Sequence, residues 1–517
     1  MSLGLLTLLI GCTNLDLLPE DERLTEEKVF SDPAAYKQYL AKLYAGLAVT
    51  SQRGPTGYGD IEGIDEGFSN YLRQYYQMQE LTTDAAVIGW NDGTIADLHG
   101  QTWTTTNEFI SAIYNRVYFQ VSQCNEFLRQ SATDKLTSRN IPANIQTEVV
   151  GMRLDARFLR ALSYWHGLDM FGGNIPFVTE TDNIGSIKPL PTTKAALFAF
   201  IEKELKEIEA TLPAPKKGEY GRADQAAAWA LLAKLYLNAE VYLGAGQGKY
   251  ADCITYCNKI IASNAYTLHP NYSGLFLADN DKSPEIIFPI CFDDKTRTWG
   301  GMTYLCHAPV GGTMKAVDYG LDGGWGGLRV TGNFVDLFPD DSAKIDNRGM
   351  FYRNGQQKNV DAIGAFTNGY AFPKYKNITS TGVAGKNLTH PDTDFPMFRL
   401  ADVYLMYAEA HLRGGGGDLA TALGYVNKLR ARAYGNATGN QTALTLPFIL
   451  AERGRELSWE CHRRTDLIRF NQFTENGVWQ WKGGVKAGKT TDKFRNIFPI
   501  PAADLIANPN LKQNDGY

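Results

Sequence analysis

Apolar residues recur at helical spacing along most of this chain. The clearest case is TKAALFAFIEKELKEIEATL, residues 193–212, where Leu197, Ile201, Leu205 and Ile208 follow one another at intervals of three or four. Side chains at that spacing lie on one face of an α-helix. The same periodicity predicts helices at residues 33–48, 107–130, 146–171, 222–242, 250–263, 397–413, 418–434 and 446–462.

Several of these expected helices follow one another closely and are rich in alanine, as in RADQAAAWALLAKLYLNAEVY, residues 222–242. Small side chains allow neighbouring helices to pack closely. Helix pairs of this kind resemble degenerate tetratricopeptide repeats, in which each pair stacks on the next. We therefore expect a mainly α fold in which helix pairs form a scaffold. Trp165, Trp229 and Trp459 lie within expected helices, so we assign them to the core, and we place Trp103 there as well.

Three long stretches lack helical spacing, namely residues 51–106, 265–345 and 346–396. They are rich in Gly, Asn, Asp and aromatic residues. Irregular segments of this length are uncommon inside compact domains and usually carry function. In GGWGGLRVTG, residues 323–332, glycines flank Trp325 where no regular element would bury it. The sequence thus predicts a loop-rich half that is supported by the helical scaffold.

Composition narrows the classes of partner. The chain has 517 residues, of which 44% are hydrophobic, enough for a large core. The net charge is −5 and no long run of like charges occurs, so nucleic acid is not an expected partner. The seven cysteines include no C-x-x-C pair. Cys253 and Cys257 are expected to be small apolar residues on one helix face rather than a metal or redox pair.

One short motif suggests nucleotide binding. GGVKAGKT, residues 483–490, fits the phosphate-binding pattern G-x-x-x-x-G-K-[ST]. In that pattern backbone N–H groups hold the phosphates, and the loop lies between a buried strand and a helix. The flanking segments NGVWQWK and TDKFRNIFPIP have neither pattern. We therefore expect residues 483–490 to form an exposed loop without bound nucleotide.

No other catalytic signature is complete. The chain contains neither a G-x-S-x-G elbow nor an H-E-x-x-H motif. Carboxylates are abundant, so a glycoside hydrolase with loop-borne carboxylates stays open as the alternative function. We expect no cofactor. Calcium stays unassigned, because DNDKSPE, residues 279–285, lacks the glycine and the twelfth-position glutamate of an EF-hand loop.

The amino terminus carries a short apolar run, LGLLTLLIGCTN, residues 3–14. It is too short to span a bilayer as a helix and resembles the core of a secretory signal. The end of the run, LLIGC, resembles the bacterial lipoprotein cleavage box, although no Lys or Arg precedes the run. We expect residues 1–11 to be removed and Cys12 to become the lipidated N-terminus. A buried N-terminal strand is the alternative.

Four longer stretches resemble one known family. ARFLRALSYWHGLDMFGGNIPFVTE, residues 156–180, is similar to a helix-to-loop signature of the SusD/RagB family. FRLADVYLMYAEAHLRG, residues 398–414, and ERGRELSWECHRRTDLIRF, residues 452–470, resemble its C-terminal helical core. The ending FPIPAADLIANPNLKQNDGY, residues 498–517, resembles its closing segment. Together with the lipoprotein start, the resemblance extends over nearly the whole chain in the family's order.

The resemblance implies an outer-membrane lipoprotein of Bacteroidota that faces the cell exterior. Such proteins bind glycans or other nutrients, have no catalytic activity, and act as a lid on a SusC-type TonB-dependent transporter. It also implies a mainly α fold with tetratricopeptide-like helix pairs and an irregular ligand-binding half. We accordingly divide the chain into a signal remnant at 1–11, an N-terminal SusD-like part at 12–264, and a C-terminal SusD/RagB part at 265–517.

The resemblance also suggests which residues bind the ligand. In characterised relatives an N-terminal loop supplies a stacking tryptophan with a nearby asparagine, which match Trp90 and Asn91 here. An acidic residue and an arginine upstream match Asp65 and Arg73. The family's central aromatic arc is matched by the stretch 299–325, which contains the aromatic residues Trp299, Tyr304 and Trp325.

This set of residues suits a sugar ligand chemically. A sugar ring has an apolar C–H face and a rim of hydroxyls, which match flat aromatic rings and polar side chains, respectively. We expect Trp90, Trp299 and Trp325 to form one exposed platform. A hydrolase would release new reducing ends from its glycan, whereas a helical scaffold that binds only proteins would retain no glycan.

Overall fold

The computed structural model describes residues 25–55, 57, 59–182, 185 and 188–517, so Cys12 lies outside the described residues. The described residues form helices and a few short strands, and none of these helices is long and apolar enough to cross a bilayer. The strands are β1 (Val87–Ile88), β2 (Ile286–Ile290), β3 (Leu328–Arg329) and β4 (Phe395–Arg399). The α-helices are α1 (Glu26–Phe30), α2 (Ala34–Ala48), α3 (Tyr71–Tyr76), α4 (Ala96–Gly100), α5 (Glu108–Gln130), α6 (Thr133–Ser138), α7 (Ala143–Phe171), α8 (Lys194–Ile208), α9 (Gln225–Leu237), α10 (Ala239–Leu243), α11 (Tyr250–Ala262), α12 (Gly301–His307), α13 (Gly332–Val335), α14 (Leu400–Leu412), α15 (Leu419–Tyr434), α16 (Leu446–Glu456), α17 (Arg463–Arg469) and α18 (Ala502–Ala507).

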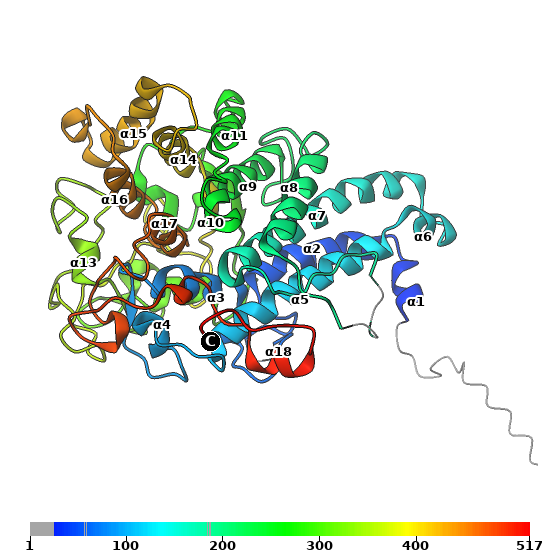
Figure 1. The fold of residues 1–517 in the computed structure, drawn as a ribbon, viewed down its shortest axis with the longest axis horizontal. Helices are drawn as coiled ribbons and strands as arrows, with labels where there is room; N and C mark the ends of the chain where they lie inside the picture. The colour runs from blue at the N-terminus through cyan, green and yellow to red at the C-terminus, as the bar shows by residue number, and fades with distance from the viewer. Residues whose placement is uncertain (1–24, 56, 58, 183–184, 186–187) are drawn as a thin grey trace, which may run out of the picture.

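Helices that follow one another in the chain pack against one another. The long helices α2, α5 and α7 lie side by side on the right of the view, and the array continues through α8, α9, α11, α14 and α15 (Figure 1). Each helix contacts the next in this order, as a scaffold of stacked helix pairs requires. The mainly α fold that the periodicity predicted is therefore confirmed.

Helix α8 illustrates how the sequence specifies this array. Its N-cap residue Thr193 accepts a hydrogen bond from the backbone N–H of Ala196 at 3.1 Å, which satisfies one of the free donors of the first turn. The apolar stripe of Leu197, Ile201, Leu205 and Ile208 is fully buried, as its spacing predicts. In α9 the buried alanines instead let the neighbouring helix α11 approach closely.

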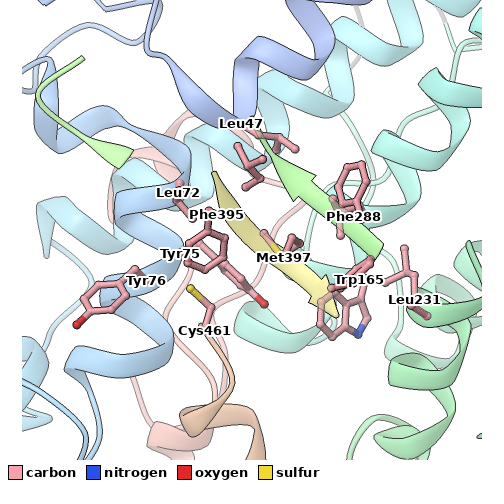
Figure 2. Close-up of a cluster of buried hydrophobic side chains, with 14 of the residues drawn as sticks. Leu47, Leu72, Tyr75, Tyr76, Trp165, Leu231, Phe288, Phe395, Met397 and Cys461 are labelled. Carbon is pink, nitrogen blue, oxygen red and sulfur yellow. The ribbon is translucent and has the colours of Figure 1, made fainter. Parts of the chain in front are cut away.

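Between the helices lies a small, fully buried sheet. β2 and β4 pair antiparallel, and every residue of both strands is buried. Figure 2 shows Phe288, Phe395 and Met397 of these strands among side chains of the surrounding helices, including Trp165 of α7 and Leu231 of α9. Because one strand precedes residue 300 and the other follows residue 390, this pairing ties distant segments of the chain into one core.

Several expected boundaries differ from the structure. Residues 397–399 belong to β4, and the helix expected there begins only at Leu400. The helix expected at 222–242 is divided at Asn238 into α9 and α10. The helix expected at 446–462 ends at Glu456, because Trp459 and Cys461 have positive φ angles of 58° and 64°, which an α-helix cannot accommodate.

Of the four tryptophans that we assigned to the core, three are buried. Trp103, Trp165 and Trp459 are buried. Trp229 is only partly buried at the edge of α9, and its indole Nε1 donates a hydrogen bond to Glu209. Cys253 and Cys257 are buried in α11, as expected for two apolar residues.

The segment 483–490 is an exposed loop between irregular segments, as the flanking sequence predicted. In urea unfolding, Lys489→Ala should leave the free energy of unfolding unchanged within about 0.5 kcal/mol, because exposed side chains away from caps and cores contribute little. Lys482→Ala is the matched control. Lys482 is buried, and its Nζ donates to the carbonyl oxygens of Thr474 and Gly477 at 2.6 and 2.5 Å. Its loss should therefore destabilise the protein. Magnesium-dependent ATP binding that Lys489→Ala abolishes would contradict the loop assignment.

Candidate functional site

Three tryptophans from separate segments meet at an open cavity of about 720 Å³. Trp90 and Trp325 are partly buried and Trp299 is 39% exposed. We call these three residues the aromatic arc. The cavity is lined by Asp65, Phe68, Arg73, Trp90, Asn91, Asp92, Trp299 and Trp325. The structure thus places together six of the seven ligand-binding residues that the sequence suggested.

A two-stranded sheet brings Trp90 and Trp325 together. β1 pairs antiparallel with β3, so that Ile88 lies opposite Leu328, and the N–H of Gly89 donates to the carbonyl of Gly327 at 3.2 Å. Trp90 lies two residues after Ile88, and Trp325 lies three residues before Leu328. A Cβ atom on Gly327 would lie 2.2 Å from the indole of Trp90. Only glycine at this position lets the ring lie against the neighbouring strand.

Trp299 is held by the segment that precedes α3. The buried carboxylate of Glu66 accepts hydrogen bonds from the backbone N–H of Trp299 at 2.9 Å and from the hydroxyl of Thr298 at 2.8 Å. A Cβ atom on Gly67 would lie 2.8 Å from the Cβ of Trp299, so glycine permits this close approach. Glu66 and Gly67 therefore fix the third ring beside the other two.

The ring planes of the aromatic arc are tilted relative to one another. The centroids of Trp90 and Trp325 are 6.2 Å apart with an interplanar angle of 49°, and those of Trp299 and Trp325 are 6.3 Å apart at 54°. His307 stacks against Trp325 at 5.0 Å and 22°, and its two ring nitrogens lie 2.7 and 3.0 Å from the carbonyls of Gly323 and Thr389. The rings therefore form a bent surface on a rigid support.

Arg73 lies beside the arc in an unusual environment. Its guanidinium is 4.5 Å from the ring centroid of Phe68 and 4.3 Å from that of Tyr304, a cation–π sandwich. The side chain is buried, and among the described residues its Nε and Nη2 have no hydrogen-bond partner. Burial lowers the pKa of Arg73, whereas Tyr304 and the carboxylate of Asp65 oppose the shift. Unpaired buried donors at the edge of a cavity can satisfy acceptors on a ligand.

Tyr304, which the resemblance suggested as a ligand-binding residue, does not line the cavity. It lies in α12, is fully buried, and packs edge-on behind Trp90 at a centroid distance of 6.1 Å. Burial raises its pKa to about 12. The helical position of Tyr304 turns its ring toward the core, so it supports Trp90 and Arg73 from behind.

Three polar residues of the site are exposed to solvent. Asn91 and Asp92 are exposed directly after Trp90. Asp65 is also exposed, and its Oδ1 accepts a hydrogen bond from the N–H of Gly67 at 2.9 Å. These groups can meet ligand hydroxyls from solvent. In the described part of the chain, no group of three His, Cys, Asp or Glu residues is placed to hold a metal ion.

Sequence reasoning missed the residues behind the arc. His307 supports Trp325, and His390 lies 5.6 Å from Trp299, centroid to centroid. Both histidines are buried, and no local pattern in the sequence distinguishes them from other core residues. Phe68 and Asp92 could have been found, because they adjoin residues of the expected site.

Comparison with known proteins places the chain in a family. One family model, described as "SusD family", matches residues 340–517, and another, "Starch-binding associating with outer membrane", matches residues 61–237. The starch-binding protein SusD of Bacteroides thetaiotaomicron is 37% identical over 531 residues, covering 92% of this chain and 91% of that protein. The chain belongs to the SusD family. SusD-like protein P2 of Formosa agariphila is 24% identical and covers 99% of this chain and 98% of its own length.

Solved structures of the SusD superfamily share this fold. A SusD superfamily protein from Parabacteroides distasonis superposes with a TM-score of 0.72 at 23% identity, covering 94% of this chain and 99% of that chain. Surface glycan-binding protein A from Bacteroides thetaiotaomicron gives 0.70 at 19% identity, covering 94% and 100%. At these identities the likeness concerns the fold, and it agrees with the SusD-like architecture expected from the sequence.

Proposed function

We propose that this protein is a surface glycan-binding lipoprotein whose ligand lies on the aromatic arc. The observation that carries the proposal is the meeting of three indoles from three separate segments at one open cavity. Burying them elsewhere would satisfy the hydrophobic effect, so their exposure at a shared cavity needs another reason. Flat indoles match the apolar faces of sugar rings, and Arg73, Asn91, Asp92 and Asp65 supply donors and acceptors for the hydroxyls.

The proposed ligand is an α-1,4-linked glucan of the starch type. A relative that is 37% identical over most of the chain is named a starch-binding protein. The tilt of about 50° between neighbouring rings of the arc supports the same choice. An α-1,4-glucan curves along its length, whereas a β-1,4-glucan is a straight ribbon that would suit coplanar rings.

A binding protein without catalysis fits the site better than a glycoside hydrolase. Hydrolysis needs a carboxylic acid that stays protonated near neutral pH, usually because apolar surroundings raise its pKa, together with a second carboxylate. The carboxylates that line this cavity, Asp65 and Asp92, are both exposed to solvent. The hydrolase alternative therefore lacks an enclosed general acid at the arc.

Calorimetric titration with maltohexaose and cellohexaose tests the ligand class. We expect maltohexaose to bind and cellohexaose to bind much more weakly, with no new reducing ends after prolonged incubation with either sugar. Equal affinity for the two hexasaccharides would contradict the proposal that the tilted rings select a curved α-1,4-glucan. Release of shorter sugars would favour the hydrolase.

Delivery to a SusC-type TonB-dependent transporter and attachment to the outer membrane complete the proposal. Family membership supports both parts, and the apolar run that ends at Cys12 supports the attachment. Several buried acyl chains at about 0.8 kcal/mol per CH₂ would anchor a large domain firmly on the exterior face. Gentle detergent extraction should co-purify a large β-barrel protein, which tests the transporter partner.

Mass spectrometry tests the lipid anchor and should find Cys12 acylated and residues 1–11 absent. An exported chain that keeps an unmodified Met1 would exclude the anchor.

A further inference from the structure

The segment 361–367, DAIGAFT, lies against the same strand ends that carry the aromatic arc. Arg329 is the last residue of β3, and its guanidinium donates hydrogen bonds to the carbonyl oxygens of Ile363 and Ala365. A Cβ atom on Gly89, next to Trp90, would lie 2.9 Å from the carbonyl oxygen of Ile363. The segment is therefore fixed to both strands of the β1–β3 sheet.

The residue that fixes this segment is costly to bury. Arg329 is fully buried, and within the described ranges no carboxylate lies within salt-bridge distance of it. Burial lowers its pKa to about 10. A buried cation that is balanced only by backbone carbonyls costs free energy relative to one paired with an acid. The two hydrogen bonds from this guanidinium tie residues 363–365 to β3, although the segment is partly exposed.

Phe366 of this segment does not line the cavity of the arc; its ring lies over Gly311 and Gly326. A Cβ atom on Gly311 would lie 3.0 Å from the Cε1 of Phe366, and one on Gly326 would lie 3.7 Å from its Cγ. Gly326 directly follows Trp325 and Gly327 lies beneath Trp90. Residues 325–327 therefore lie next to three aromatic rings. These are the ring of Trp325 itself, the ring of Phe366 beside Gly326, and the ring of Trp90 beside Gly327.

Phe366 is not needed for the hydrophobic core. Its side chain is partly exposed, and it is not among the described side chains that pack against the core, which include Trp90 and Trp325. The glycines beneath it leave room for a ring to lie flat on the backbone. A partly exposed ring on a rigid, side-chain-free surface is a platform of the kind that sugar rings contact.

We propose that Phe366 is a further sugar-stacking residue, which prolongs the aromatic arc beyond Trp325. This inference rests on the proposed glycan-binding function. It also defines a specificity: chains long enough to reach Phe366 bind more tightly than chains held by the three tryptophans alone. Arg329 is a positioning residue for this platform. Its guanidinium binds the carbonyl oxygens of Ile363 and Ala365, and Ala365 directly precedes Phe366.

The alternative role of Phe366 is purely structural, as a cover over Gly311 and Gly326. The two roles differ in what a small apolar substitute does. Phe366→Leu keeps an apolar cover of similar volume but removes the flat ring. If Phe366 only covers the glycines, leucine should preserve both stability and binding, since volume-conserving apolar exchanges are tolerated best.

The test compares maltotriose with maltooctaose by calorimetric titration of the full chain. For the wild type we expect affinity to rise with chain length. For Phe366→Ala and Phe366→Leu we expect unchanged affinity for maltotriose and about a fivefold loss for maltooctaose, equivalent to about 1 kcal/mol for one partly exposed ring. Thermal melts of both variants check that they are folded.

Two further variants separate this inference from the proposed function. Trp325→Ala should weaken both sugars, whereas Phe448→Ala, which removes a partly buried phenylalanine of α16 that packs against the core, should weaken neither. Wild-type affinity of folded Phe366→Leu for maltooctaose would overturn the role of Phe366 while leaving the arc intact. A wild-type protein that binds neither sugar would overturn the glucan assignment and this inference together.

Discussion

Arg399→Met is expected to destabilise the folded protein by about 3–5 kcal/mol, because it removes one cationic partner from each of three buried carboxylates. Arg399 ends β4, and its guanidinium donates to Glu285, Glu456 and Glu460 at 2.6–2.8 Å. All four side chains are essentially inaccessible to solvent. They belong to a larger buried ion network that also contains Arg348, Arg432, Lys374, Glu452 and Asp346.

The destabilisation caused by Arg399→Met should become smaller as the pH falls. Although burial opposes it, Arg432, Arg399 and Arg348 hold the pKa of Glu456 at about 2, below its unfolded value of 4.5. The stabilisation from this carboxylate is therefore present above about pH 4.5 and is lost as the pH falls toward 2. Without Arg399 the pKa of Glu456 lies closer to 4.5. The difference in unfolding free energy between wild type and variant should therefore become smaller as the pH falls from about 4.5 toward 2.

Urea unfolding at several pH values measures both effects through the midpoint and the m-value. Arg353→Met is the matched control. Arg353 forms an ion pair with Asp341 at 3.0 Å, but both side chains are exposed, at 44% and 36%, and such pairs contribute about 0–1 kcal/mol. A loss for Arg399→Met no larger than that of the control would show that the buried network contributes little to stability.

Alanine in place of each tryptophan of the aromatic arc should weaken glycan binding by about 2 kcal/mol, roughly thirtyfold. The reason is that a large, flat contact surface disappears from the centre of the site. Trp299 is the most exposed of the three and Trp325 rests on His307, so Trp299→Ala should cost the least stability. Losses from combined variants are not expected to add, because the rings adjoin one another.

Calorimetric titration of each variant with maltohexaose, beside thermal melts, measures affinity and stability separately. Trp229→Ala is the matched control, because Trp229 is partly buried on α9 and hydrogen-bonds Glu209 outside the cavity. It should lower the melting temperature and leave affinity unchanged. If all three arc variants are folded and bind as tightly as the wild type, the ligand lies elsewhere.

Most of the helical scaffold could be predicted from the sequence. The stripe of α8, the cap at Thr193 and the alanines of α9 are local features, so a window of a few turns contains the information that specifies each helix. The errors occurred at helix ends. Residues 397–399 have apolar spacing that fits a helix as well as a strand, and only the partner β2 assigns them to a sheet.

The site was predictable only in part. Family resemblance and loop composition identified Trp90, Trp299 and Trp325, and the structure brings them to one cavity. Tyr304 lies outside the cavity, because its stretch, which reads as a loop, forms α12 in the folded chain and its ring is buried. The positions of Arg329 and Phe366 had no sequence signal at all, because Arg329 binds carbonyls of residues 363 and 365 and Phe366 lies over Gly311 and Gly326, all in separate segments of the chain.

The sequence by itself determined the helices, the loop-rich half and the kinds of side chain available for a ligand, because periodicity and composition act over short distances along the chain. Only the tertiary structure decided which of those side chains share a surface. β1 and β3 are each two residues long, too short to leave a pattern, yet their pairing joins residues about 240 positions apart and brings Trp90 and Trp325 of the aromatic arc together. Such a pairing depends on the packing of the whole core, which no local segment of the sequence contains.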